Sequence, residues 1–284
     1  MRVLPILFNM DMVRAIPCGR KTATRRPVKY KYSNTEMKMH TDKYGTRLIE
    51  IQKDVEGETF GRNEDGTTWH KLRGYVEPKP PYHTGDILYV RETWCFLKCN
   101  DCMQKDECFP KVGSDGCCIY RADYGNTEDD SFPPSMFKWH PSIHMPKFAA
   151  RIWLKVTDVR VERLQDITEN QAIKEGISRL YDDFPDDEYE DWTKRTGIYP
   201  KQKTEWKYKN YLWHGSFGNY GIGNWKSDGW DYQYSSYENA VGSFSSLWNS
   251  TLKKSDIVRY GWDANPWVWV IEFEQCEKPK IDLA

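Results

Sequence analysis

The chain has 284 residues, with 41 Lys and Arg against 42 Asp and Glu, so its formal net charge is −1. This balance excludes a uniformly basic nucleic-acid coat, and every apolar run falls short of the roughly 18 residues that a transmembrane helix needs. Residues 1–16 contain Asn9, Asp11 and Arg14 and are not typical of a signal peptide. We therefore expect a cytoplasmic protein that does not enter the membrane. Aromatic residues make up 15% of the chain, and their rings can fill a core or stack on bases.

The start of the chain predicts a strand, a short helix and a second strand. Residues 5–8 are an apolar run of strand type, and residues 10–16 have helical spacing before a Pro and a Gly end the helix. In residues 19–27, β-branched and basic side chains alternate, which predicts a strand whose polar face points into a cleft. Residues 31–79 are polar, contain turn signals and predict one or more hairpins in an insertion.

Two strands and a helix are predicted in the middle of the chain. Residues 84–94 begin with a Gly-Asp turn and predict a strand, and residues 149–161 predict a longer strand that bends as in a barrel. Thr168 and Gly176 mark the two ends of a helix. Glu175 would then lie at the helix C-terminus, where a carboxylate is disfavoured unless another group holds it.

The last third of the chain combines a long insertion with two regular elements. Residues 181–191 are strongly acidic and predict a solvated loop. Residues 199–237 are rich in Trp and Tyr and predict a lid over the core, with a stacking platform for bases as the alternative. Residues 237–252 predict an amphipathic helix, and residues 265–273 predict a closing strand.

Eight cysteines in a chain without an export signal favour a metal site over a disulfide framework. Six of them lie between positions 95 and 118, and two of these form a C-x-x-C pair. The predicted ligands of a structural zinc ion are Cys99, Cys102, Cys108 and Cys117, with Cys118 or Cys95 as substitutes. The alternative is a set of buried free thiols.

Positive charge is concentrated at the start of the chain. The first thirty residues contain seven Lys or Arg and one acidic residue. This asymmetry predicts an anionic partner, with phosphate contacts from Arg20, Lys21, Arg25 and Arg26. The alternative is a solvated basic strand beside the acidic loop.

The order of these segments resembles the ASCH domain family, which has a small PUA-like β-barrel, and especially its longer members in phage and prophage genomes. The resemblance depends on the G-x-K-T-x-T-x-R motif, a later G-D-x-L-x-V segment, a helix that ends in Glu-Gly and a terminal strand. The matching segments are residues 3–27, 82–94, 148–177 and 238–273. The insertions are residues 31–79, 95–147 and 178–237. The resemblance implies one domain over residues 1–284, of α+β class, in which short helices flank a mixed barrel. The zinc knuckle that the cysteines predict would lie in one of the insertions.

The resemblance also implies a chemistry. The family includes an amidohydrolase that removes the acetyl group from N4-acetylcytidine, and its functional residues correspond to Lys21, Thr24 and Glu175. Thr24 would attack the amide carbonyl, Lys21 would accept the proton, and Glu175 would position Lys21 or protonate the leaving amine. The lysine pKa would have to fall from about 10.4 toward 7; burial and nearby arginines favour this fall, whereas Glu175 opposes it.

Three functional hypotheses follow. The first is binding of RNA or a modified nucleoside in a cleft lined by Lys21, Thr24, Arg26 and Glu175. The second is hydrolysis of an N-acylated pyrimidine nucleoside in the same cleft. The third is a phage-encoded protein-interaction module that uses the insertions as its contact surface. We expect a monomer in each case.

Overall fold

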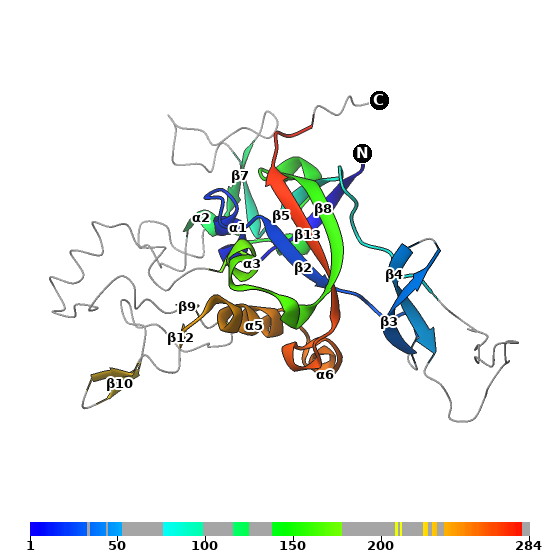
Figure 1. Ribbon diagram of the computed structural model, residues 1–284. Coiled ribbons are helices and arrows are strands. Elements are labelled where there is room, and N and C mark those ends of the chain that lie inside the picture. Colours follow the sequence, from blue (N-terminus) through cyan, green and yellow to red (C-terminus); the bar gives the residue numbers. More distant parts are fainter. Residues whose placement is uncertain are drawn as a thin grey trace, which may run out of the picture.

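The computed structural model describes residues 1–32, 35–43, 45–52, 76–98, 116–124, 138–177, 208–209, 211, 224–226, 229–231 and 236–279. Its architecture is α+β, as predicted: a five-stranded mixed sheet lies beside several short helices (Figure 1). Most of the two later insertions lies outside the described residues.

The central sheet contains β1 (Val3–Leu7), β2 (Ala23–Pro27), β5 (Ile87–Arg91), β8 (Trp153–Arg163) and β13 (Trp267–Gln275). Its strand order is β1-β5-β8-β13-β2; β1 pairs with β5 in parallel, and the other neighbours are antiparallel. The β13–β8 register shifts between Glu272 and Phe273. This bulge bends the long strand, as the sequence predicted.

Strands β1 and β2 are the two edges of the sheet, and in the described part of the chain no backbone pairing closes it into a barrel. Side chains connect β1 to its surroundings instead. The Arg26 guanidinium donates a hydrogen bond from β2 to the Leu7 carbonyl (3.0 Å), and the Tyr82 hydroxyl donates one to the Pro5 carbonyl (2.8 Å). Pro5 is accommodated because an edge strand does not need every backbone N–H for pairing.

Two hairpins extend from the sheet. Strands β3 (Thr35–Asp42) and β4 (Gly45–Gln52) form the hairpin predicted in the first insertion, and it projects to one side of the sheet (Figure 1). Strands β6 (Trp94–Lys98) and β7 (Gly116–Tyr120) form the second hairpin. The remaining short pairs are β9 (Tyr208–Lys209) with β12 (Ser236–Tyr237) and β10 (Asn224–Lys226) with β11 (Gly229–Asp231).

The helices are short. They are α1 (Met10–Ala15), α2 (Arg121–Tyr124), α3 (Glu169–Lys174), α5 (Ala240–Ser250) and α6 (Ile257–Tyr260). Single 3₁₀ turns occupy Ser142–His144, Lys147–Ala149, Leu164–Asp166, Lys254–Asp256 and Trp262–Ala264. Among the described helices, none is long and apolar enough to cross a membrane.

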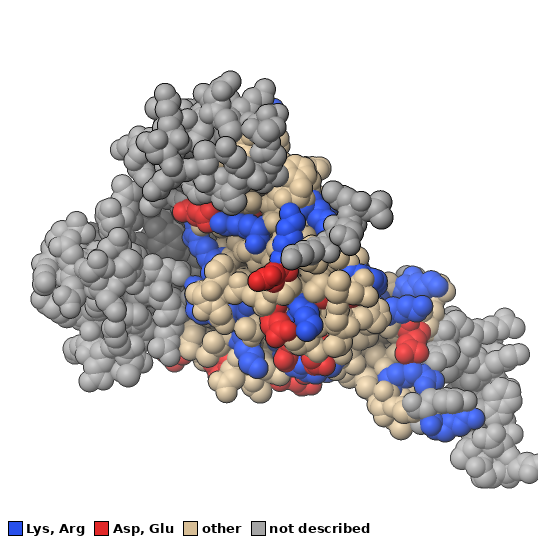
Figure 2. Space-filling view, turned by 90° about the horizontal axis from the view of Figure 1, so that it is seen from above, with Lys and Arg blue, Asp and Glu red and all other residues tan. Residues whose placement is uncertain are grey.

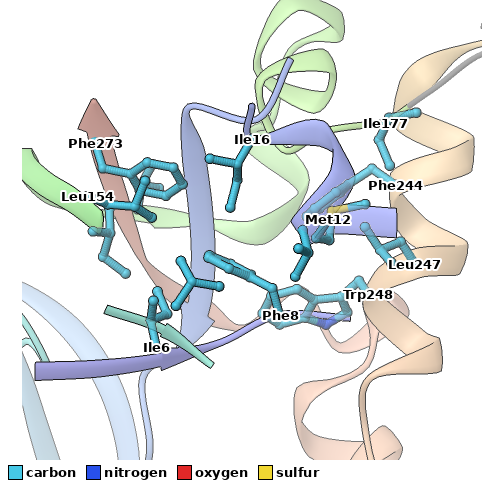
Figure 3. Packing of buried hydrophobic residues seen from close by; sticks show 14 of the residues in the cluster. Ile6, Phe8, Met12, Ile16, Leu154, Ile177, Phe244, Leu247, Trp248 and Phe273 are labelled. Atoms are coloured by element: carbon cyan, nitrogen blue, oxygen red, sulfur yellow. The ribbon is translucent and has the colours of Figure 1, made fainter. Parts of the chain in front are cut away.

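The main core lies where α1 and α5 meet the sheet (Figure 3). Phe8, which follows β1, packs against Phe273 of β13 with ring centroids 6.1 Å apart. Met12 of α1 and both Phe244 and Trp248 of α5 are buried in the same cluster. Four of the 23 buried residues in this cluster are aromatic, so aliphatic side chains supply most of this core.

Local chemistry fixes both ends of α3. Thr168 accepts a hydrogen bond from the Gln171 backbone N–H, and the Gln171 side chain accepts one from the Thr168 N–H, which completes a capping box. The helix ends before Gly176, whose φ of +92° suits a residue without a Cβ atom. Glu175 therefore occupies the helix C-cap, as predicted.

Candidate functional site

The C-terminal end of α3 brings Glu175 against the segment that leads into β2. Lys21 and Glu175 are joined by an isolated antiparallel bridge, and the Thr22 N–H donates to the Lys174 carbonyl (2.9 Å). The side chains of Lys21, Thr24, Arg25 and Glu175 are all buried, with residue exposures of 1–3%. Backbone pairing thus places several ionisable groups inside the protein.

Glu175 forms two ion pairs. Its Oε2 lies 3.2 Å from Lys21 Nζ, and its Oε1 lies 3.1 Å from Arg25 Nη1. A carboxylate at a helix C-terminus meets the negative end of the helix dipole, and these two cations offset that repulsion. The sequence indicated that Glu175 needed such partners but did not identify them.

Lys21 is held as a three-fold hydrogen-bond donor. Its Nζ donates to the Ala23 carbonyl (2.8 Å), the Glu175 carbonyl (2.7 Å) and Glu175 Oε2 (3.2 Å). Burial lowers the pKa of Lys21 to about 8, while Glu175 acts in the opposite direction. At neutral pH the side chain is therefore mainly an ammonium group, and all three of its protons are engaged.

Thr24 lies on the other face of β2 from Arg25, because neighbouring strand residues alternate in direction. Its hydroxyl accepts a hydrogen bond from Arg26 Nη1 (2.8 Å) and, within the described residues, has no hydrogen bond to Lys21. The Phe8 ring connects the two cations: Lys21 Nζ lies 5.0 Å and the Arg26 guanidinium carbon 5.5 Å from its centroid. Lys21 does not activate Thr24 as a nucleophile in this geometry.

Of the four predicted phosphate-binding residues, Lys21, Arg25 and Arg26 lie together. Arg20 lies in the turn before β2, where its Nε donates to the Cys18 sulfur (3.2 Å). On the face shown in Figure 2, Lys and Arg side chains are mixed with Asp and Glu over the central part and gather on the projecting β3–β4 hairpin at the right.

An ion network that sequence reasoning missed connects this cluster to the surface. Arg25 Nη2 lies 3.2 Å from Glu162 Oε2, and Glu162 Oε1 lies 2.6 Å from Arg160 Nε. Arg160 also pairs with Asp158 (2.8 Å) and Glu272 (2.7 Å). The i, i+2 spacing of Asp158, Arg160 and Glu162 on one face of a predicted strand was the signal that could have revealed it.

Sequence reasoning also missed a groove beside Arg26, with a volume of about 550 Å³. The basic and aromatic side chains that line it are Arg26, Lys29, Lys31, Lys79, Tyr82 and Trp269. Only Arg26 among these had been assigned to a site from the sequence.

Of the four predicted zinc ligands, Cys99, Cys102 and Cys108 lie outside the described residues. Cys117 is buried in β7. Burial raises the pKa of Cys95 and of Cys118, the two suggested substitutes. Among the residues whose positions are described, no group of three or more His, Cys, Asp or Glu side chains is placed to hold a metal ion.

Comparisons with protein-family models, curated proteins and solved structures find no match to this chain. The case for its function therefore depends on the geometry described above.

Proposed function

We propose that the chain is an ASCH-type, PUA-like module that binds RNA or a modified nucleoside or base at the cluster of Lys21, Thr24, Arg26 and Glu175. The observation that carries this proposal is the meeting of Glu175 with the basic motif, across sequence separations of 154 and 150 residues. The resemblance to the ASCH family assigned these residues to one site. The ion pair between Lys21 and Glu175 and the hydrogen bond from Arg26 to Thr24 support that assignment.

Thr24 gives the cluster a donor suited to a base. Its hydroxyl oxygen accepts from Arg26, and in the described part of the chain the hydroxyl proton has no acceptor. Base carbonyls and ring nitrogens are acceptors that such a hydroxyl can recognise. Arg26 adds a charge that suits a phosphate, so one ligand nucleotide could use both side chains.

The test is calorimetric binding of cytidine, N4-acetylcytidine and a short single-stranded RNA to the full chain. Thr24→Val keeps the shape and removes the hydroxyl, and it should weaken binding about two- to tenfold, the contribution of one neutral hydrogen bond. Thr22→Val is the matched control because the hydrogen bonds of Thr22 are made by its backbone. Absence of binding by the unmodified chain to all three ligands contradicts the proposal.

The second candidate is hydrolysis of an N-acylated pyrimidine nucleoside. The observation in its favour is the lowered pKa of Lys21, about 8, which moves this lysine toward the range of a general base. The reaction would also require Thr24 to exchange its Arg26 contact for one with Lys21. Catalytic hydrogen bonds often form only when substrate is bound, so this rearrangement is compatible with the chemistry.

Incubation with N4-acetylcytidine, followed by chromatography for cytidine, tests the hydrolase. No cytidine, beside a competent positive control, contradicts the activity. Activity that survives Lys21→Ala contradicts the role of Lys21 as the base.

Further parts of the resemblance remain proposals. We propose that the sheet belongs to a PUA-like barrel, in which Arg26 and Tyr82 connect the strand edges, and that a structural zinc ion uses Cys117. A protein partner on the insertions is the third functional candidate, tested by trimming residues 178–237 and measuring partner binding and folding.

A further inference from the structure

The groove beside Arg26 is built by segments that are distant in the sequence. The end of β2, Trp269 of β13, Glu50 of β4 and residues 76–82 line it. The β3–β4 hairpin, which belongs to the first insertion, thus contributes Glu50 to the lining. The volume of the groove, about 550 Å³, is within the range of about 300–1,000 Å³ that ligand sites occupy.

The groove carries excess positive charge. Lys29, Lys31 and Lys79 are exposed, and none of them has an ion-pair partner among the described residues. The two carboxylates in the lining are already engaged. Glu50 is buried and accepts hydrogen bonds from the Lys31 N–H (2.8 Å), the Tyr32 N–H (2.8 Å) and the Thr35 hydroxyl (2.5 Å).

The second carboxylate, Glu77, is exposed and lies 3.8 Å from Arg47 of the hairpin. Three lysines and Arg26 therefore face the groove without a matching number of available acids. A ligand that fits this charge is a polyanion rather than a neutral nucleoside.

Aromatic side chains line the same groove. Trp269 pairs with Arg26 across the β13–β2 ladder and is half-buried. The hydroxyl of Tyr82 donates to the Pro5 carbonyl, which fixes the ring in place (2.8 Å). Arg26 lines the groove and also donates a hydrogen bond to Thr24 (2.8 Å), so this residue belongs to both the groove and the proposed site.

We infer that this groove binds single-stranded nucleic acid, with phosphates on Lys29, Lys31 and Lys79 and a base stacked on Trp269. Lysines that follow a backbone, together with rings on which bases stack, are the combination that single-strand-binding proteins use. The inference rests on the proposed function and deepens it: the ligand is a polynucleotide chain that leads one nucleotide toward Arg26 and Thr24. A free nucleoside would leave the three lysines without a ligand group.

The test is fluorescence anisotropy of short labelled RNA and DNA single strands with the full chain, over a series of salt concentrations. The groove variant replaces three exposed lysines with glutamine: Lys29→Gln, Lys31→Gln and Lys79→Gln. The control variant removes three exposed lysines that do not line the groove: Lys155→Gln, Lys174→Gln and Lys254→Gln.

The groove variant should bind at least about tenfold more weakly, and its log–log salt slope should flatten by about 2, since each single-strand phosphate contact contributes about 0.7. The control variant should bind like the unmodified chain. Trp269→Leu should weaken binding about tenfold without a change of slope, because stacking releases no counterions. Circular dichroism checks that the chain with this replacement of a half-buried residue still folds, and the lysine variants test the groove independently.

The outcomes separate a failure of the groove inference from a failure of the proposed function. If the chain binds RNA and the groove variant binds equally well, the groove inference is wrong and the proposed function stands. If cytidine alone binds as tightly as the RNA, the phosphate track is wrong although nucleoside binding stands. If DNA binds and RNA does not, the groove is supported and its RNA ligand is wrong. If no nucleic acid or nucleoside binds, both proposals fail.

Discussion

Gly176 directly follows Glu175 at the end of α3 and packs against α1. Replacing Gly176 with Ala should therefore disturb both folding and the site. Its φ is +92°, a conformation that residues with a Cβ rarely adopt. A Cβ added there would lie 3.0 Å from the Cβ atoms of both Ala15 and Lys21 and 3.2 Å from the Met12 sulfur. Gly176→Ala therefore combines backbone strain with a steric conflict at Lys21.

The two contributions can be estimated separately. A positive φ costs a residue with a Cβ about 1–2 kcal/mol. Overpacking in a filled region costs about 1–3 kcal/mol more. We expect Gly176→Ala to lower the free energy of unfolding by about 2–5 kcal/mol and to weaken ligand binding, because the neighbouring Lys21 must move.

Urea denaturation followed by tryptophan fluorescence measures the change. Gly85→Ala is the matched control: its φ is +87°, and an added Cβ would meet nothing within 4 Å. It should lose only the conformational part, about 1–2 kcal/mol. Equal losses for the two variants would refute the steric argument, and unchanged ligand binding by Gly176→Ala would refute its link to the site.

Three further predictions follow from the ion pairs and the cysteines. Glu175→Gln leaves two buried cations without their shared carboxylate and should cost about 3–5 kcal/mol in urea denaturation, whereas Glu162→Gln, at a partly exposed position, should cost about 1 kcal/mol or less. The Arg2 hydrogen bond lowers the pKa of Asp86 from 3.8 to about 2, so the stability it provides should be complete above pH 3.8 and lost as the pH falls through 2. Arg2→Met should flatten the acid side of the plot of unfolding free energy against pH. An unchanged acid side contradicts the assignment of this pH dependence to the Arg2–Asp86 pair. Native mass spectrometry should find one zinc ion per chain, and a folded metal-free chain contradicts the zinc proposal.

Elements whose limits depend on local chemistry could be predicted from the sequence. The capping residue Thr168 and the positive-φ Gly176 bound the third helix because each acts on its own neighbouring backbone. The predicted closing strand became β13, in which burial alternates from Trp267 to Val270 as in a half-buried strand, whereas the first three residues of β2 are all buried.

The site could be predicted only in part. That Glu175 needed a cation followed from its place at a helix end, but the identity of Arg25 as its partner depends on how β2 lies against α3. The resemblance supplied the pairing of Glu175 with Lys21. The spacing of Glu162 and Arg160 indicates that they share a strand face, but the contact of Glu162 with Arg25 arises from the register of β2, β13 and β8 across the sheet.

The groove could not be predicted for the same physical reason. Lys29 and Lys31 were visible as charges near the motif, and Trp269 was visible as part of a closing strand. What joins them is the position of the β3–β4 hairpin beside β2, and no local pattern encodes that distance. Long-range juxtaposition therefore limited prediction of the binding surface more than it limited prediction of the elements.

The hydrogen bonds of Lys21 and Thr24 favour the proposed binding over the proposed hydrolysis. For Lys21 to accept a proton from Thr24, it must lose a proton that now bonds an acceptor, and hydrogen bonds to charged groups contribute about 1.5–3 kcal/mol each. Thr24 must also leave Arg26, whose guanidinium donates to the hydroxyl and cannot accept its proton because it is already protonated. A substrate would have to offset both losses through its own contacts. A ligand that only binds leaves the three hydrogen bonds of Lys21 in place, and the groove lysines are exposed to it.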